Sequence, residues 1–448
     1  MVEIASTRNL RRVPQPQREK RGTKATRQEH FLCMQGRNST SSTSMHPSKS
    51  GSRPVTSPTP AFTPSPTPSP HQTFLLEDAS PGTAPPAKAE PAPRLYAGLT
   101  QEEKARIATI YAFTHSKKEF SIRYDVDEIM GFGSNGTILS AIDTLTNTPC
   151  AIKIIYKHHA AFDTPLPAEI AVLRATSHTS RYLIEYIQDW QDVHHFYLVT
   201  ARFGTDWRRV AETFSGEPIT ETRLEPLTFL GGMYRMHTLP ISFGSNDLFG
   251  WAHAQRLQAI AREGHARIAF APVKRIVKQT AAGLLAMHKR GFYHGDCKLE
   301  NILVHQPEGT ICALSIRLID FGHSKPLTVP LERYGTRLLC APEYFPDSPY
   351  APHQRDMPLA DVFALGIMMF MLLNEDGAFP TASVGLDRGS LGFWDLMELD
   401  SGRFPFDWVE DLDLEAWDLL QGMCHVDPNK RFGMKDVLEH PWLADIVV

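Results

Sequence analysis

Residues 293–301 read Tyr293-His294-Gly295-Asp296-Cys297-Lys298-Leu299-Glu300-Asn301. They follow an apolar segment with helical spacing, Val273–Lys289, and precede the β-like run Ile302–Val304. Three further short motifs come after them in order: Ile319-Asp320-Phe321-Gly322, Gly335-Thr336 and Ala341-Pro342-Glu343. Each motif alone could be accidental, so only their shared order and spacing are informative.

A glycine-rich turn lies upstream, in the predicted β-hairpin Gly131-Phe132-Gly133-Ser134-Asn135-Gly136-Thr137-Ile138. The turn joins two strands and not a strand to a helix, so it does not fit a dinucleotide-binding fold. Glycines at such a turn let backbone N–H groups approach nucleotide phosphates. An isolated strand lysine is usually exposed, but Glu169, on the short predicted helix 168–175, is a candidate partner for Lys153 on a neighbouring strand. This ion pair would hold the ammonium group against α- and β-phosphate oxygens.

The secondary-structure pattern changes along the chain. Thr100 and Glu103 form a capping box that predicts a helix over residues 101–113. β-branched and aromatic residues then dominate up to Phe203, and helical spacing dominates after about residue 270. This order predicts a β-rich lobe followed by an α-rich lobe. The expected strands are Val126–Phe132, Thr137–Asp143, Pro149–Tyr156, Tyr182–Trp190 and His195–Phe203.

Together these motifs resemble those of the eukaryotic protein kinase family, over about residues 124–443. The resemblance implies an α+β, bilobal fold with a small β-rich N-lobe (124–200) and a larger α-helical C-lobe (204–443). The interval from Ala201 to His294 is about twice as long as is usual, which places an insert at about 206–246. The insert is either a docking or lid element or a tolerated surface loop. Residues 97–123 form a preceding helix and linker.

The resemblance also implies ATP and Mg²⁺ as the nucleotide and the metal, with a role for each motif residue. Asp296 would accept or orient the proton of the acceptor hydroxyl, and Lys298 would stabilise the transferring phosphoryl group. Asn301 and Asp320 would ligate Mg²⁺ through oxygen. The other implied catalytic residues are Lys153, Glu169 and Thr336; the nucleotide-binding set is Gly131, Phe132, Gly133, Ser134, Asn135, Gly136, Ile138, Ala151, Lys153, Thr200, Phe203 and Leu303.

Two features refine the expected activity. Lys298, and Thr336 five residues before Ala341, resemble serine/threonine kinases more than tyrosine kinases. Gly295 replaces the arginine that in this family usually pairs with a phosphate on the activation loop, and Glu332 lies about where that phosphate often falls. We therefore predict a protein serine/threonine kinase, acting on protein substrates, that does not depend on activation-loop phosphorylation.

One departure from the family pattern concerns the helix that carries Glu169. Pro165 and Pro167 start this helix unusually close to the glutamate. The sequence therefore leaves open whether Lys153 and Glu169 pair without help from the helix at 101–113.

Two alternative functions remain open. Small-molecule kinases of the aminoglycoside and choline type share an HGD…N loop, but they lack the Ala-Pro-Glu segment and the expected pairing of Glu343 with Arg431. A pseudokinase-like scaffold is the other alternative, because the insert and the N-terminal segment could both bind partners. The retained charged motif residues argue against a scaffold.

The composition divides the chain into two parts. Residues 1–96 carry 15 of the 34 prolines and a net charge of +7, while the remainder carries −11. The first part is predicted to be a disordered basic tail. Its six Ser/Thr-Pro steps within residues 57–70 are either acceptor sites for proline-directed kinases or a stiff linker. Its basic cluster within residues 11–24 is either a nuclear address or solvated charge.

Several classes of protein are disfavoured. The longest apolar run, residues 362–373, is 12 residues long, short of the roughly 20 that cross a bilayer. The first residues do not resemble a secretory signal, and the six cysteines show no metal-like spacing. An acidic folded part argues against nucleic-acid binding. These features predict an intracellular protein, cytoplasmic and/or nuclear, without membrane or nucleic-acid partners.

Overall fold

A computed structural model describes residues 96–116, 120–157, 165–216, 224–231, 234–242, 245–307, 313–329, 336, 339–344, 357–374 and 414–447. All of them belong to one compact unit, Pro86–Val448. The Ser/Thr-Pro steps, the basic cluster and Glu332 lie outside the described residues, so their roles stay predictions.

The N-lobe is a five-stranded antiparallel sheet with the strand order β1-β2-β3-β5-β4. Its residues alternate between two faces, as the period of a strand requires. On β3, Ile152 and Ile154 are fully buried on one face, while Lys153 points to the other. The strands are β1 (Tyr124–Phe132), β2 (Gly136–Asp143), β3 (Thr148–Tyr156), β4 (Tyr186–Gln191) and β5 (His195–Ala201).

One predicted strand begins too early. Residues 182–184 do not pair with the N-lobe sheet; instead Ile184 N donates to Leu318 O and Leu318 N donates to Tyr182 O. These bonds join the segment to β10 (Ser315–Leu318) of the C-lobe. The apolar composition of residues 182–184 suits either partner, which is why sequence alone could not place the boundary.

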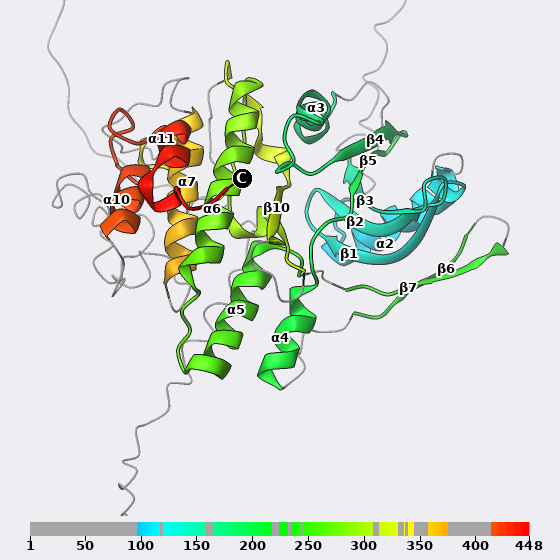
Figure 1. Ribbon diagram of the computed structural model, residues 1–448. Coiled ribbons are helices and arrows are strands. Elements are labelled where there is room, and N and C mark those ends of the chain that lie inside the picture. The colour runs from blue at the N-terminus through cyan, green and yellow to red at the C-terminus, as the bar shows by residue number, and fades with distance from the viewer. Residues whose placement is uncertain are drawn as a thin grey trace, which may run out of the picture. The chain divides into compact units, whose positions relative to one another are not determined.

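The C-lobe is mainly helical, and it lies beside the sheet in Figure 1. The most apolar helix, α7, is buried on nearly every face, as a helix without a polar side must be. The α+β, bilobal fold expected from the sequence is confirmed. The C-lobe elements are α5 (Leu248–Glu263), α6 (Phe270–Lys289), α7 (Met357–Leu373), α10 (Leu414–Met423), α11 (Met434–Glu439), β8 (Phe292–Tyr293), β9 (Ile302–His305), β10 and β11 (Lys325–Pro326).

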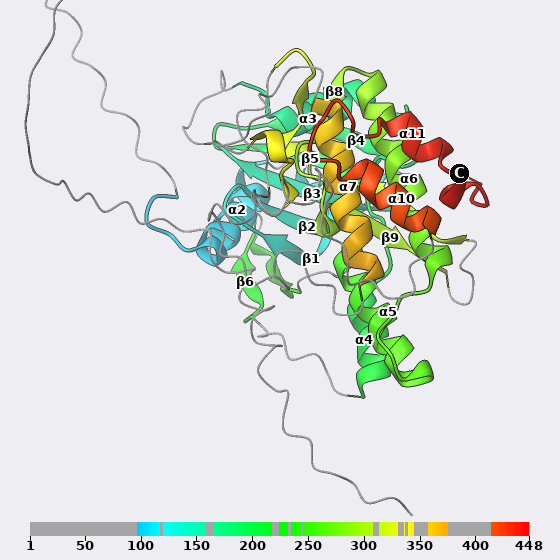
Figure 2. The same ribbon diagram turned by 90° about the vertical axis from the view of Figure 1, so that its left-hand side faces the viewer.

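The predicted N-terminal helix is α2 (Gln101–His115), and Thr100 and Glu103 form its capping box. It packs against β1, β2 and β3 on the face of the sheet that turns away from the C-lobe (Figure 2). Ala108, Ala112 and Phe113 enter the same apolar cluster as Ile152 and Ile154 of β3. The helix is therefore part of the N-lobe core.

The insert is built into both lobes. Its helix α4 (Trp207–Ser215) packs on α5, and the indole Nε1 of Trp207 donates to Val304 O at 3.1 Å. Its hairpin, β6 (Leu227–Leu230) and β7 (Met236–Leu239), continues into residues that bond to β1: Ile129 N donates to Pro240 O, and Ser242 N donates to Ile129 O, both at 3.0 Å. Its described part is therefore not a loose surface loop.

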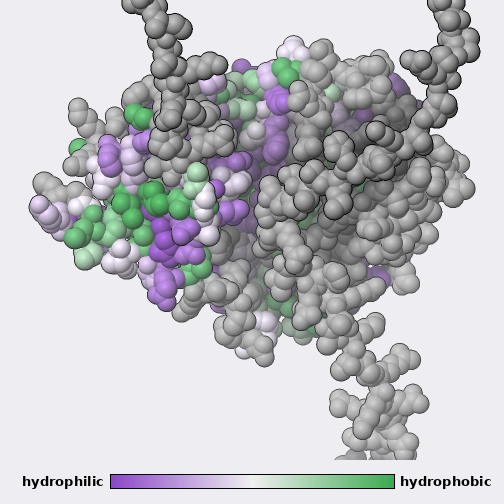
Figure 3. Space-filling model, turned by 180° about the vertical axis from the view of Figure 1, so that it is seen from behind, coloured by the Kyte–Doolittle hydropathy of each residue, from purple (hydrophilic) through white to green (hydrophobic). Residues whose placement is uncertain are grey.

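The surface of the N-lobe mixes apolar and polar residues. Figure 3 shows this from behind, with an apolar area on the left of the molecule. The exposed apolar side chains include Leu230, Tyr234 and Met236 of the hairpin. Among the described residues, no helix combines the length and the apolar character needed to cross a membrane.

Candidate active site

A charge cluster joins the two lobes at Lys153. Its ammonium Nζ lies 2.7 and 2.9 Å from the two carboxylate oxygens of Glu169 and 3.2 Å from Asp320 Oδ1. Burial opposes the charge of Lys153, but the two carboxylates outweigh burial and raise the pKa of Lys153. Lysine therefore stays protonated here and remains a donor for any further anion.

The helix that carries Glu169 forms despite the prolines before it. Helix α3 (Ala168–Thr176) begins after Pro167, whose backbone is extended and which supplies no side-chain cap. Glu169 occupies the first turn, where a negative charge is favoured by the helix dipole. The direct contact between Lys153 and Glu169 is present; the help expected from the helix at 101–113 stays a prediction.

The backbone of the motif 293–301 is held by one buried carboxylate. Asp361 of α7 accepts hydrogen bonds from His294 N at 2.9 Å and Gly295 N at 3.0 Å. The ring of His288, at the end of α6, lies 2.9 Å from the same carboxylate. Burial alone would raise the pKa of Asp361, but the hydrogen bond and charge of His288 lead the effects that lower it. Sequence analysis missed His288, because its one distinguishing feature, a position six residues before His294, becomes meaningful only when α6 and α7 are packed together.

The predicted catalytic side chains converge on Asp296. Thr336 Oγ1 donates to Asp296 Oδ1 at 2.6 Å, and Lys298 Nζ lies 3.0 Å from Asp296 Oδ2. Lys298 Nζ also lies 3.3 Å from Thr336 Oγ1. A hydroxyl group therefore fits between this carboxylate and this ammonium, which is the arrangement that proton acceptance and charge stabilisation require.

The predicted metal ligands fit a cation that is shared with phosphate. Asn301 Nδ2 donates to the backbone oxygen and the carboxylate of Asp296, at 2.8 and 3.1 Å, so its amide oxygen is the atom left for a cation. The charge of Lys153 is the main cause that lowers the pKa of Asp320 to about 2, which keeps this carboxylate ionised. The described residues contain no group of three or more His, Cys, Asp or Glu that could hold a metal alone. Mg²⁺ commonly binds through one or two protein ligands together with substrate phosphates.

The predicted nucleotide-binding residues line the region between the sheet and β9. Gly133 N donates to Gly136 O at 2.9 Å and closes the turn between β1 and β2; Gly131 and Phe132 end β1, and Ser134 and Asn135 lie in the turn. Ile138 pairs with Lys153, and Ala151 pairs with Thr200, across neighbouring strands. Leu303 lies on β9 in the C-lobe, while the ring of Phe203 lies under Arg317, 4.5 Å away.

One acidic residue beside this region was not among the predicted site residues. Asp247 caps α5 by accepting a hydrogen bond from Gly250 N at 2.8 Å, and it pairs with Leu303 in an isolated bridge. Burial is the main cause that raises its pKa to about 6, and the charge of Glu300 adds to the effect. Its sequence signal, a residue starting a predicted helix, is compatible with capping alone.

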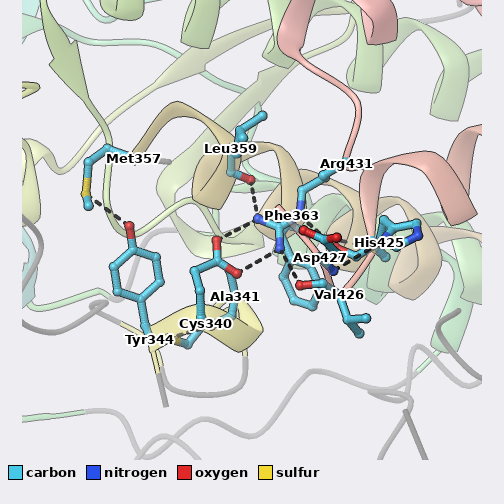
Figure 4. Close-up of polar contacts among 12 residues, drawn as sticks. Cys340, Ala341, Tyr344, Met357, Leu359, Phe363, His425, Val426, Asp427 and Arg431 are labelled. Carbon is cyan, nitrogen blue, oxygen red and sulfur yellow. Dashed lines mark hydrogen bonds and ion pairs between the residues drawn. The ribbon is translucent and has the colours of Figure 1, made fainter. Parts of the chain in front are cut away.

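A second ion pair lies deeper in the C-lobe. The guanidinium of Arg431 bonds to both carboxylate oxygens of Glu343, at 2.7 and 2.8 Å, and neither side chain is exposed (Figure 4). Arg431 also donates to Leu359 O at 3.0 Å and to His425 O at 2.9 Å. The pairing expected from the sequence is thus present, and the two bonds between Arg431 and Glu343 are buried.

With the bilobal fold and these contacts described, comparisons with known proteins give the proteins that this chain is similar to. The protein kinase domain model matches residues 249–443. Calcium-dependent protein kinase 4 of Plasmodium berghei is 23% identical over 337 residues, which cover 73% of this chain and 51% of the relative. Serine/threonine-protein kinase DCLK3 of mouse is 28% identical over 169 residues, 38% of this chain and 20% of the relative.

A third relative is also a serine/threonine-protein kinase by name. Serine/threonine-protein kinase PLK4 of Nematostella vectensis is 27% identical over 190 residues, 42% of this chain and 17% of the relative. The chain spans about half the length, or less, of these curated relatives. The matching domain model and these relatives support the resemblance to the eukaryotic protein kinase family that the motifs indicated. A protein kinase domain uses ATP and Mg²⁺ in general.

The position of Gly295 generates the first prediction. Its φ is +75°, and a Cβ there would lie 2.8 Å from His323 O. We expect Gly295→Ala to lower the free energy of unfolding by about 1–3 kcal/mol, because alanine is strained at this φ and crowds a carbonyl. The control is Gly291→Ala, since Gly291 has φ +82° but no atom within 4 Å of the added Cβ. If urea unfolding gave the same loss of free energy of unfolding for both variants, the close approach of the added Cβ to His323 O would not be the cause of the loss.

The Glu343–Arg431 pair generates the second. Arg431→Met leaves a buried carboxylate without its partner, so we expect a loss of about 3–5 kcal/mol in the free energy of unfolding. The matched control is Lys430→Met, because Lys430 is exposed and its ion pair with Asp427 is long, at 4.0 Å. Adding Glu343→Leu to Arg431→Met should recover part of the loss. If Arg431→Met cost no more than Lys430→Met, the buried pair would not stabilise the C-lobe.

Proposed function

We propose that this chain is a protein serine/threonine kinase that transfers the γ-phosphoryl group of ATP to Ser or Thr hydroxyls of protein substrates. The observation that carries the proposal is the position of the Thr336 hydroxyl, between Asp296 and Lys298. A serine or threonine of a substrate presents the same aliphatic hydroxyl group. The retained charge cluster at Lys153 supports ATP binding beside it.

Each charged side chain has one task in the proposed transfer. Asp296 holds the acceptor hydroxyl and takes up its proton as the oxygen bonds to the γ-phosphorus and the bond from that phosphorus to ADP breaks. Lys298 offsets the charge of the transferring group, and Lys153 holds the α- and β-phosphates. Bound Mg²⁺ would neutralise phosphate charge, with Asn301 and Asp320 as its ligands.

The two alternatives explain fewer observations. A pseudokinase-like scaffold does not need Lys153, Glu169 and Asp320 to meet at ion-pair distances. A small-molecule phosphotransferase does not need the buried Glu343–Arg431 pair that holds the Ala-Pro-Glu segment. The insert is the feature that a scaffold would use, and its described part is committed to packing within the chain.

We further propose that turnover does not require phosphorylation of the activation loop. Gly295 has no side chain to receive a loop phosphate, and its backbone is already held by Asp361. Thr336 is bonded to Asp296 and Lys298 without a phosphate. Phosphorylation by proline-directed kinases at residues 57–70, and a cytoplasmic or nuclear location, stay proposals from the sequence.

The activity is tested by phosphotransfer from ATP with Mg²⁺ to basic peptides carrying Ser, Thr or Tyr. Asp296→Asn should lower kcat by about 10²–10⁴, the usual contribution of a catalytic acid or base, and Lys153→Met should also abolish most transfer. The matched controls are Asp418→Asn and Lys435→Met, which make the same chemical changes at exposed positions. Equal incorporation by all variants would contradict the proposal. Transfer only to small alcohols, or ATP binding without transfer, would favour one of the alternatives.

Loop independence is tested by treating the purified chain with phosphatase before the assay. We expect the rate to stay the same, and Thr328→Ala to behave like wild type, because neither change removes a contact of Asp296. Thr336→Ala is not a clean test, since it deletes the bond to Asp296. A rate that depends on prior phosphorylation of the loop would show that this proposal is wrong.

A further inference from the structure

Tyr96, the first residue that the structure describes, is packed onto a pair of residues in the N-lobe sheet. Its ring centroid lies 4.7 Å from that of Tyr156 on β3 and 5.9 Å from that of His195 on β5. Tyr156 and His195 face each other directly across these strands. The hydroxyl of Tyr96 also forms a hydrogen bond with His195 Nε2. Tyr96 therefore covers and ties together the ends of two strands.

The residues that contact Tyr96 belong to a buried network of polar groups that are hydrogen-bonded to one another. His195 is fully buried, and its backbone N–H donates to Asp192 Oδ1 at 2.8 Å. The other carboxylate oxygen of Asp192 accepts from Tyr197 OH at 2.6 Å and from Ser116 Oγ at 3.2 Å. Tyr111 of α2 packs on the His195 ring, with centroids 5.1 Å apart. Since these groups satisfy one another, they form a fixed support and not a mobile patch.

Tyr156 connects this support to the glycine-rich turn. Its hydroxyl forms a hydrogen bond with Thr137 Oγ1, and its backbone N–H donates to Asn135 O at 2.9 Å. Gly136 lies between these two residues, and a Cβ there would come within 2.4 Å of Ile154 O. The end of the turn is thus pressed against β3, at the point where Tyr156 holds it.

None of these contacts reaches the nucleotide side of the sheet. Tyr156 shares the outer apolar cluster with Ile152 and Ile154, whereas Lys153 and Ile155 alternate to the opposite face. Tyr96 and Tyr156 can therefore affect ATP only by fixing the backbone of the turn.

We propose that Tyr96 is a positioning residue for the phosphate-binding turn: by clamping Tyr156 against His195, it holds Asn135–Thr137 where their backbone can bind ATP phosphates. The proposal rests on the proposed function, in which residues 131–136 bind those phosphates. It gives the segment before α2 a specific part in nucleotide affinity. A change that draws Tyr96 from its support would weaken phosphate binding and leave the contacts to adenine in place.

The test compares dissociation constants for ATP and for adenosine, measured by calorimetry with Mg²⁺ on the full chain. Adenosine lacks the phosphates, so it reports the rest of the site. Tyr96→Ala should raise the dissociation constant of ATP about three- to tenfold, the size of one lost hydrogen bond, without changing that of adenosine. Tyr96→Phe keeps the ring and should lie between wild type and Tyr96→Ala.

Two further variants separate positioning from general stability. Tyr156→Phe removes only the hydroxyl that reaches Thr137, so it should show the same selective loss of ATP affinity even if Tyr96→Ala folds poorly. Phe113→Leu is the control, because Phe113 packs in the same apolar layer against Phe120 and Phe229 without touching Tyr156. It should lower the melting temperature and leave both dissociation constants unchanged.

The outcomes distinguish a failure of the proposed ATP binding from a failure of the positioning role of Tyr96. Wild type that binds no ATP would overturn the proposed function and, with it, this inference. The positioning role alone would be overturned if wild type binds ATP but both variants, Tyr96→Ala and Tyr156→Phe, leave the ATP and adenosine affinities unchanged. It would also be overturned if the two affinities fall in parallel in these variants. A lower ATP affinity in Phe113→Leu equal to that in Tyr96→Ala would show that the effect is one of stability.

Discussion

One ammonium group connects the parts of this molecule on which the proposed phosphoryl transfer would depend. Lys153 stands on the N-lobe sheet, Glu169 on a helix beside it, and Asp320 in the C-lobe, and the three charges meet within 3.2 Å. Two carboxylates and one ammonium leave an excess of negative charge, which a cation or a rearranged lysine must balance when phosphates enter. The cluster would therefore favour a nucleotide that arrives with Mg²⁺.

The charged groups keep these positions because each lobe holds its own part of the site rigidly. In the C-lobe, Asp361 fixes the backbone before Asp296 through two N–H groups, which supports the proposal that Asp296 keeps its position without a loop phosphate. In the N-lobe, α2 and the hairpin of the insert cover the outer face of the sheet and complete a second apolar core. Lys153 lies on one face of that sheet, and the support for the glycine-rich turn lies on the other.

Much of the fold and of the candidate site could be predicted, because these features depend on residues that are close together in the sequence. The capping box at Thr100 marks the start of α2. The alternation of apolar residues on β3 indicates which side chains are buried, and the short spacing from Asp296 to Asn301 is consistent with the hydrogen bond between them. The contacts that were missed are long-range. His288 and Asp361 meet only when two helices pack, and Tyr96 reaches His195 across 99 residues, so no pattern along the chain records either contact. For the same reason, the sequence did not show whether the insert is a functional element or a surface loop, because the residues that follow its hairpin bond to the distant strand β1.

The most direct test of this account is a crystal structure of the chain with Mg²⁺ and a non-hydrolysable ATP analogue. We predict that the phosphates lie beneath residues 131–136, that Lys153 contacts them while still paired with Glu169, and that Asn301 and Asp320 bind the metal. A structure in which the phosphates bind elsewhere, or in which Lys153 and Glu169 separate when the nucleotide is bound, would contradict it.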